Sequence, residues 1–93
     1  MSEQETAEVT ALQALAWLVA NEDLSPVFLS SSGLSEAELR ARAGEPELLG
    51  SVLDFLLMDD AWVIAFCDAH QVPYERLAQA RAALPGGEQV HWT

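Results

Sequence analysis

The segment PELLGSVLDFLLM, residues 46–58, decides the fold of this chain. Wound as a helix, it places apolar side chains around nearly its whole circumference, and Asp54 occupies the narrow polar sector that remains. A helix that is apolar almost all round belongs in the interior of a bundle, because no face of it favours water. We therefore predict that residues 46–58 form a central helix around which the rest of the chain packs.

Capping and periodicity signals on both sides of this segment predict further helices. The clearest signal is the capping box of Ser35 and Glu38, which begins a helix that ends near Ala43. The other helices are expected over residues 6–21, 25–33, 59–70 and 73–84. On the first of them, side chains at helical spacing predict the stripe that faces the core: Val9, Leu12, Leu15, Ala16 and Val19.

The sequence also matches itself at a shift of about 38 residues, which indicates an internal repeat. The shift places Trp17 on Phe55 and Phe28 on Phe66. Each unit then consists of an apolar helix, a short helix with a central phenylalanine and a capped third helix. We predict that Trp17 and Phe55 mediate packing between the two units. Chance similarity between two leucine-rich patterns is the alternative.

These patterns predict an all-α, six-helix bundle of the orthogonal type, built from two tandem three-helix units related by a pseudo-twofold axis. All 93 residues fit into one domain. Its expected parts are a mobile acidic lead over residues 1–5, a first unit over 6–44, a second unit over 45–84 and a C-terminal tail over 85–93.

The charge of the chain is strongly acidic. Its 15 Asp and Glu side chains stand against 4 arginines, with no lysine, and the formal net charge is −11. Nucleic acids and anionic membranes attract clustered positive charge, so we exclude both kinds of partner. A hydrophobic content of 51% excludes a disordered chain. The charge favours a protein partner of basic or amphipathic character.

The start of the chain and its short apolar runs predict a cytoplasmic protein. A secretory signal begins with positive charge, whereas this chain begins MSEQE. The longest apolar runs are shorter than the about 20 residues that cross a bilayer. Because Cys67 has no second cysteine to pair with, the expected fold does not depend on an oxidising compartment.

Two groups of side chains are candidates for chemistry. Cys67 and His70 lie three residues apart on one face of a predicted helix, a spacing that suits nucleophilic catalysis or two metal ligands. Asp54, Asp59 and Asp60 supply carboxylates near one helix junction, and oxygen ligands suit a divalent cation. A zinc site needs two more ligands, and no spacing resembles a calcium-binding loop. We therefore assign no catalytic, cofactor or metal residue and keep these side chains for an alternative function.

A non-catalytic protein-interaction or regulatory module is the function that these features favour. An apolar groove between the two units, edged with carboxylates, would suit a basic or amphipathic partner. A homodimer belongs to the same class. The candidate contact residues are Trp62 and Val63 on a short helix and His91 and Trp92 in the tail. The alternative is a small metal- or ligand-binding protein or enzyme that uses the acidic and Cys–His region.

Four segments carry a resemblance to a known family: ALAWLVANE (14–22), GLSEAELRARA (33–43), VLDFLLMDD (52–60) and RAALPGGE (81–88). They resemble a family of short, uncharacterised proteobacterial proteins, a domain of unknown function. The resemblance extends from about Ala11 to Glu88. It implies an all-helical fold and a bacterial cytoplasmic location, and it implies no activity, cofactor or catalytic residue.

Overall fold

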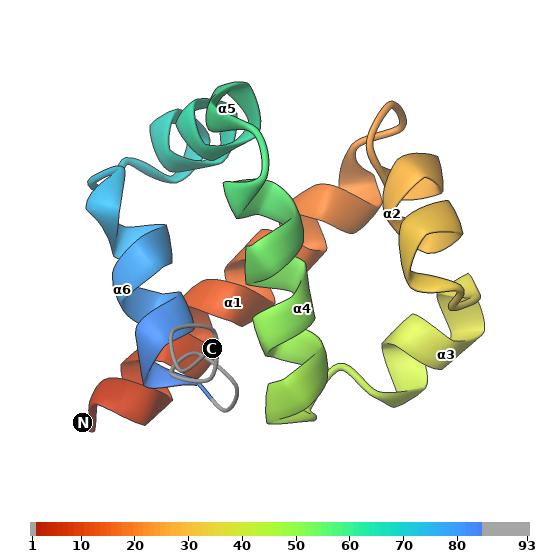
Figure 1. Ribbon diagram of the computed structural model, residues 1–93, viewed down its shortest axis with the longest axis horizontal. Coiled ribbons are helices and arrows are strands. Elements are labelled where there is room, and N and C mark those ends of the chain that lie inside the picture. The colour runs from red at the N-terminus through yellow and green to blue at the C-terminus, as the bar shows by residue number, and fades with distance from the viewer. Residues whose placement is uncertain (1, 85–93) are drawn as a thin grey trace, which may run out of the picture.

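The computed structural model describes residues 2–84, and all of the regular structure in that range is α-helical (Figure 1). The helices are α1 (Glu3–Ala20), α2 (Ser25–Ser32), α3 (Glu36–Ala41), α4 (Pro46–Leu57), α5 (Asp60–His70) and α6 (Glu75–Ala83). The predicted all-α class and the predicted order of helices are confirmed. No helix in the described range is both long and apolar enough to cross a membrane.

Side-chain caps fix where three of these helices begin. The Ser35 hydroxyl accepts a hydrogen bond from the Glu38 backbone N–H at 3.1 Å, and the Ser35 backbone N–H donates to the Glu38 carboxylate at 2.9 Å. This predicted capping box is confirmed, and the bond from the Ser35 backbone holds the pKa of Glu38 below its ordinary value, because it favours the charged carboxylate. Asp59 caps α5 by accepting from the Ala61 N–H at 2.8 Å.

The first helix begins earlier than predicted, and residues 3–5, expected in a mobile lead over residues 1–5, are helical. α1 begins at Glu3, because Ser2 and Glu5 form a second capping box. The Ser2 hydroxyl accepts from the Glu5 N–H at 3.1 Å, and the Ser2 N–H donates to the Glu5 carboxylate at 3.0 Å. The S-x-x-E signal that identified the box at Ser35 was therefore also present here.

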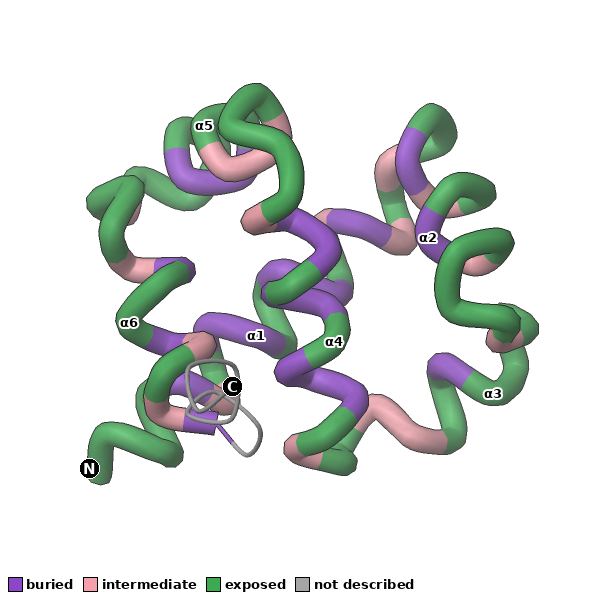
Figure 2. The backbone as a smooth tube through the Cα atoms, viewed as in Figure 1, coloured by how far each residue is buried: buried purple, intermediate pink, exposed green. Residues whose placement is uncertain are grey.

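α4 is the central helix, as its sequence predicts. It packs against α1, α5 and α6, and the buried segments of Figure 2 gather where α1 and α4 cross. The side chains that it buries cover about half of its circumference: Leu48, Leu49, Val52, Leu53, Phe55 and Leu56. Asp54 lies in the remaining polar sector, where its carboxylate accepts a hydrogen bond from Arg81 Nε of α6 at 2.6 Å.

The predicted core-facing stripe of α1 is wrong at three of its five positions. Val9 and Leu12 are each 43% exposed, and Ala16 is exposed as well. Leu15 is buried and Val19 packs against the core, as predicted, but the other buried side chains lie on the side opposite Val9 and Ala16: Ala7, Thr10, Ala11, Ala14 and Leu18. Both sides of α1 are apolar, so periodicity alone does not choose between them. The small alanines let the backbones of α4 and α6 approach closely, and this packing decides which side is buried.

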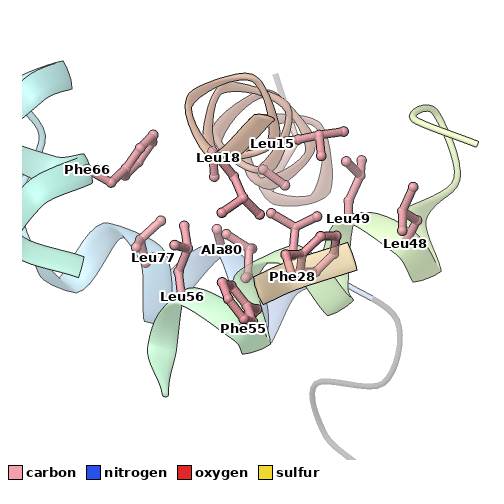
Figure 3. Close-up of a cluster of buried hydrophobic side chains, with 14 of the residues drawn as sticks. Leu15, Leu18, Phe28, Leu48, Leu49, Phe55, Leu56, Phe66, Leu77 and Ala80 are labelled. Atoms are coloured by element: carbon pink, nitrogen blue, oxygen red, sulfur yellow. The ribbon is translucent and has the colours of Figure 1, made fainter. Parts of the chain in front are cut away.

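Two aromatic pairs join the two halves of the chain. Trp17 of α1 meets Phe66 of α5 edge to face, with ring centroids 5.8 Å apart and planes at 74°. Phe28 of α2 meets Phe55 of α4 in the same manner, at 5.1 Å and 73°. Figure 3 shows Phe28 beside Phe55, with Phe66 on the other side of the core. The prediction that Trp17 and Phe55 mediate packing between the halves is confirmed.

The third helices of the two halves pack differently. α6 lies against both α1 and α4, whereas α3 has no extensive contact with any other helix. α3 is also shorter, with 6 residues against 9 in α6, and Leu39 is its single buried residue. The tandem arrangement with a pseudo-twofold axis therefore stays a prediction for the bundle as a whole.

Candidate functional site

A groove of about 410 Å³ opens between α2, the residues that lead into and out of α3, and α4. Its floor is apolar and consists of Phe28, Leu34, Leu48, Phe55 and Met58. We call this the α2–α4 groove. α3 has few contacts with α4 or with the other helices of the described range.

An aromatic row supports the floor of the α2–α4 groove. Phe55 contacts Phe28 on one side, and its ring stacks on Trp62 of α5 on the other, with centroids 4.7 Å apart and planes at 18°. Trp62, a predicted contact residue, is half-buried against Phe55 and does not line the groove. Val63 is also half-buried against the core and does not line the groove. The other predicted contact residues, His91 and Trp92, lie outside the described residues.

Polar side chains form the rim of the α2–α4 groove. Asp54 is held by Arg81, while Arg42 is held by Glu45 through Nε at 2.8 Å. The Glu45 carboxylate raises the pKa of Arg42 above its ordinary value, because it stabilises the charged guanidinium. The Glu47 carboxylate and the hydroxyls of Ser31, Ser32 and Ser51 complete the rim.

Met58 is the most accessible part of the floor. It is 71% exposed, more than any other large apolar residue in the described range. Methionine is unbranched and polarisable, so it adapts to apolar surfaces of different shapes. Met58 follows Ser51 and Asp54 at helical spacing, and all three line the groove, so the periodicity of α4 is the signal that could have found it.

A second cavity, of about 600 Å³, lies between the start of α1 and α6. Alanines form much of its lining, and Arg76 and Glu3 place one charge of each sign there. The buried Thr10 hydroxyl already donates to the Thr6 carbonyl at 3.1 Å. Since no aromatic or large apolar side chain lines this cavity, the α2–α4 groove is the better candidate for binding.

Comparison with protein families gives one match. Residues 4–87 match the family described as protein of unknown function (DUF3572). The chain belongs to the DUF3572 family. This finding confirms the resemblance to a domain of unknown function, and the α2–α4 groove lies wholly within the DUF3572 match. No curated protein and no solved structure matches the chain.

The DUF3572 fold does not bring the predicted chemical side chains together. Cys67 is fully buried, and its thiol donates to the Pro73 carbonyl at 3.6 Å. His70 is exposed and lies against the Phe66 ring, with centroids 4.5 Å apart. The thiol and the imidazole therefore lie in separate environments, and the arrangement expected of a catalytic pair is absent from this helix.

The carboxylates are separated in the same way. Asp59 is the cap of α5, Asp60 is exposed in its first turn, and Asp54 is bound to Arg81. Within residues 2–84, no group of three or more His, Cys, Asp or Glu side chains is placed to hold a metal ion. The candidates for the alternative function therefore do not form a shared site in this part of the chain.

Cys67 of this DUF3572 protein is expected to be chemically inert while the chain is folded. Burial is the main cause that raises the pKa of the Cys67 thiol, and the Asp68 and Glu75 carboxylates raise it further. A raised pKa lowers the thiolate fraction at pH 7–8, and the thiolate is the reactive form. We expect native Cys67 to react with a disulfide reagent at least about ten-fold more slowly than the same chain in denaturant. Equal rates would contradict this burial.

Proposed function

We propose that this protein is a small, non-catalytic interaction module, and that its α2–α4 groove binds an amphipathic segment of another protein that carries basic residues. The observation that carries the proposal is the groove itself, with an aromatic and aliphatic floor below a rim that includes Glu47 and Asp54. The proposal keeps the cytoplasmic location and the basic or amphipathic partner expected from the sequence.

The floor and the rim would contribute in different ways. Apolar side chains inserted against Phe28, Leu34 and Met58 would remove apolar surface from water, at about 25 cal/mol per Å². The rim and the net charge of −11 would act mainly on the rate of encounter and on the choice of partner. A basic segment would be attracted and a second acidic protein repelled.

We further propose that the groove originates in the tandem organisation of the chain. The repeat shift exchanges the Trp17–Phe66 pair with the Phe55–Phe28 pair, and the two pairs have similar geometry. Under the same shift, the contact of α6 with α1 corresponds to a contact of α3 with α4, and that contact is not extensive. In this view the second unit uses its third helix to close the bundle, and the first unit leaves the corresponding surface open as the groove.

The test is affinity capture with the full chain from a native extract, followed by reconstitution with the purified partner. Met58→Glu places a charge over the apolar floor, and because Met58 is 71% exposed, its replacement leaves the fold intact. We expect Met58→Glu to reduce recovery of the partner about ten-fold or more, as burial of an unpaired carboxylate predicts. Ile64→Glu is the matched control, since Ile64 is 42% exposed and lies outside the groove.

The control variant should recover the partner as the unmodified chain does, and circular dichroism should give the same helix content for all three proteins. Equal recovery by Met58→Glu would contradict a role for the groove. Failure to recover any stoichiometric protein with the unmodified chain would contradict the interaction function itself.

A further inference from the structure

α1 has a second apolar surface, on the side opposite the core. Val9, Leu12, Ala16 and Ala20 follow one another at helical spacing, and all are exposed. We call these four residues the α1 outer face. The helices that pack on α1 contact its other side, where its buried residues lie. None of the four lines the α2–α4 groove, so the two surfaces are separate.

The composition of α1 is unusual for an exposed helix. The chain carries 15 acidic residues, yet no residue from Val9 to Asn21 is charged. A helix at a protein surface ordinarily places charged or polar side chains opposite its buried stripe. On α1, only Gln13 interrupts the apolar character of the outer side. An exposed apolar stripe without charged residues is a candidate for contact with another protein.

Charges at the two ends of the α1 outer face indicate what covers it. Glu5 and Glu8 lie at its N-terminal end, and Glu22 and Asp23 follow its C-terminal end. No basic residue precedes Arg40 in the chain. Both ends of the surface are therefore negative, and an apolar stretch lies between them.

A second copy of this chain does not fit these charges. If two α1 helices packed antiparallel through their outer faces, Glu5 and Glu8 of one copy would lie near Glu22 and Asp23 of the other. Parallel packing would place each acid beside its own equivalent. Like charges in contact across an interface cost several kcal/mol. An anionic membrane would be repelled by the same side chains.

We propose that the α1 outer face binds an amphipathic helix of a partner protein whose apolar stripe is bounded at both ends by Lys or Arg. Glu8 and Ala20, the last residue of α1, are 12 positions apart, which corresponds to about 18 Å along the helix, and Glu22 follows in the next turn of the chain. The partner helix therefore carries its basic residues at least about three turns apart, with leucine-like side chains between them. This surface does not depend on the α2–α4 groove, and a chain with both would connect two protein segments.

The probe for this proposal is a synthetic helical peptide of about 18 residues with leucines on one face and two lysines at each end. It is titrated into the ¹⁵N-labelled full chain, and amide chemical shifts identify the surface that binds. We expect the largest shifts at Val9, Leu12 and Ala16. Leu12→Glu should weaken binding about ten-fold or more, and a peptide with glutamate in place of lysine should bind about ten-fold more weakly.

Two variants separate binding at this surface from a general effect of charge and from unfolding. Ile64→Glu carries the same change of charge as Leu12→Glu at a position of similar exposure that lies outside both surfaces, and it should leave the affinity for the peptide within about two-fold. Ala16→Lys repels a basic peptide without removing a large side chain, and it should weaken binding as Leu12→Glu does. Circular dichroism verifies the helix content of each variant.

Four outcomes would overturn the proposal. The first is that the peptide does not bind, and the second is that its shifts are confined to the groove residues Phe28, Phe55 and Met58. The third is a concentration-dependent dimer in sedimentation that Leu12→Glu abolishes. The fourth is binding to phosphatidylglycerol vesicles that depends on Leu12, in a protein that does not bind the peptide. Shifts confined to the groove would at the same time support the proposed function. The two proposals can therefore fail separately.

Discussion

Replacing Phe66 with alanine is expected to lower the free energy of unfolding by about 3–5 kcal/mol. Phe66 is 0% exposed and is the largest fully buried side chain of the described core. Its ring meets Trp17 edge to face at 5.8 Å and lies against His70 at 4.5 Å. The substitution removes the transfer free energy of the ring, leaves a cavity and breaks one of the two aromatic contacts that join the halves.

The measurement is denaturant unfolding followed by circular dichroism. Ile64→Ala on the same helix is the control, because Ile64 is 42% exposed, and we expect that variant to change stability by no more than about 0.5 kcal/mol. A small domain has about 5–15 kcal/mol of stability in total, so Phe66→Ala should unfold at a much lower denaturant concentration. A loss below about 1 kcal/mol would show that Phe66 is not at the centre of the core.

The parts of the fold that sequence predicts are those that depend on local signals. The Ser35–Glu38 capping box is complete within four consecutive residues, so no distant contact is needed to recognise it. The central place of α4 follows from a segment that is apolar on nearly every side, because such a segment has no stable exposed position. Trp17 and Phe55 were predicted as contacts between halves because the repeat places them at equivalent positions.

The parts that sequence does not predict depend on how the helices approach one another. α1 has two apolar sides, and the choice between them depends on the fit of Ala11 and Ala14 against α4 and α6. The ion pair of Asp54 with Arg81 joins side chains 27 positions apart, and no local pattern indicates it. The cap at Ser2 also has a local signal, the pair of Ser2 and Glu5 at the spacing of a capping box. The high acidic content of residues 1–5 favours a mobile segment instead, and the capping box is the signal that prevails.

The candidate site also combines features that the sequence predicts with features that depend on how the helices pack. A groove between the halves edged with carboxylates was predicted as a type of surface, because two amphipathic units that pack together leave a seam. The part of its lining that precedes α4 could not be predicted, because Phe28 and Leu34 reach the groove only through the placement of α2 and α3 against α4. Trp62 is predicted as a contact residue because its short helix carries more apolar side chains than it needs if one face is solvated, and its ring instead stacks on Phe55.

Leu18→Ala and Leu12→Ala are expected to differ widely, although both remove the same atoms from the same helix. Leu18 is 0% exposed, so its truncation should lower the free energy of unfolding by about 2–5 kcal/mol. Leu12 is 43% exposed on the opposite side, and its truncation should change stability by no more than about 0.5 kcal/mol. Alanine and leucine have similar helix propensities, so the difference between the two variants reports packing alone.

This pair tests the assignment of α1 and the α1 outer face together. If Leu12→Ala proved the more damaging variant, the stripe predicted from periodicity would face the core, and the outer face would not be available to a partner. If Leu18→Ala is the more damaging, an 18-residue helix presents Val9 and Leu12 to solvent at no benefit to the stability of the isolated chain. Val9 and Leu12 would then not stabilise the monomer, although the chain is otherwise rich in charge, with a net charge of −11. Binding to another protein is the physical explanation that we propose for them.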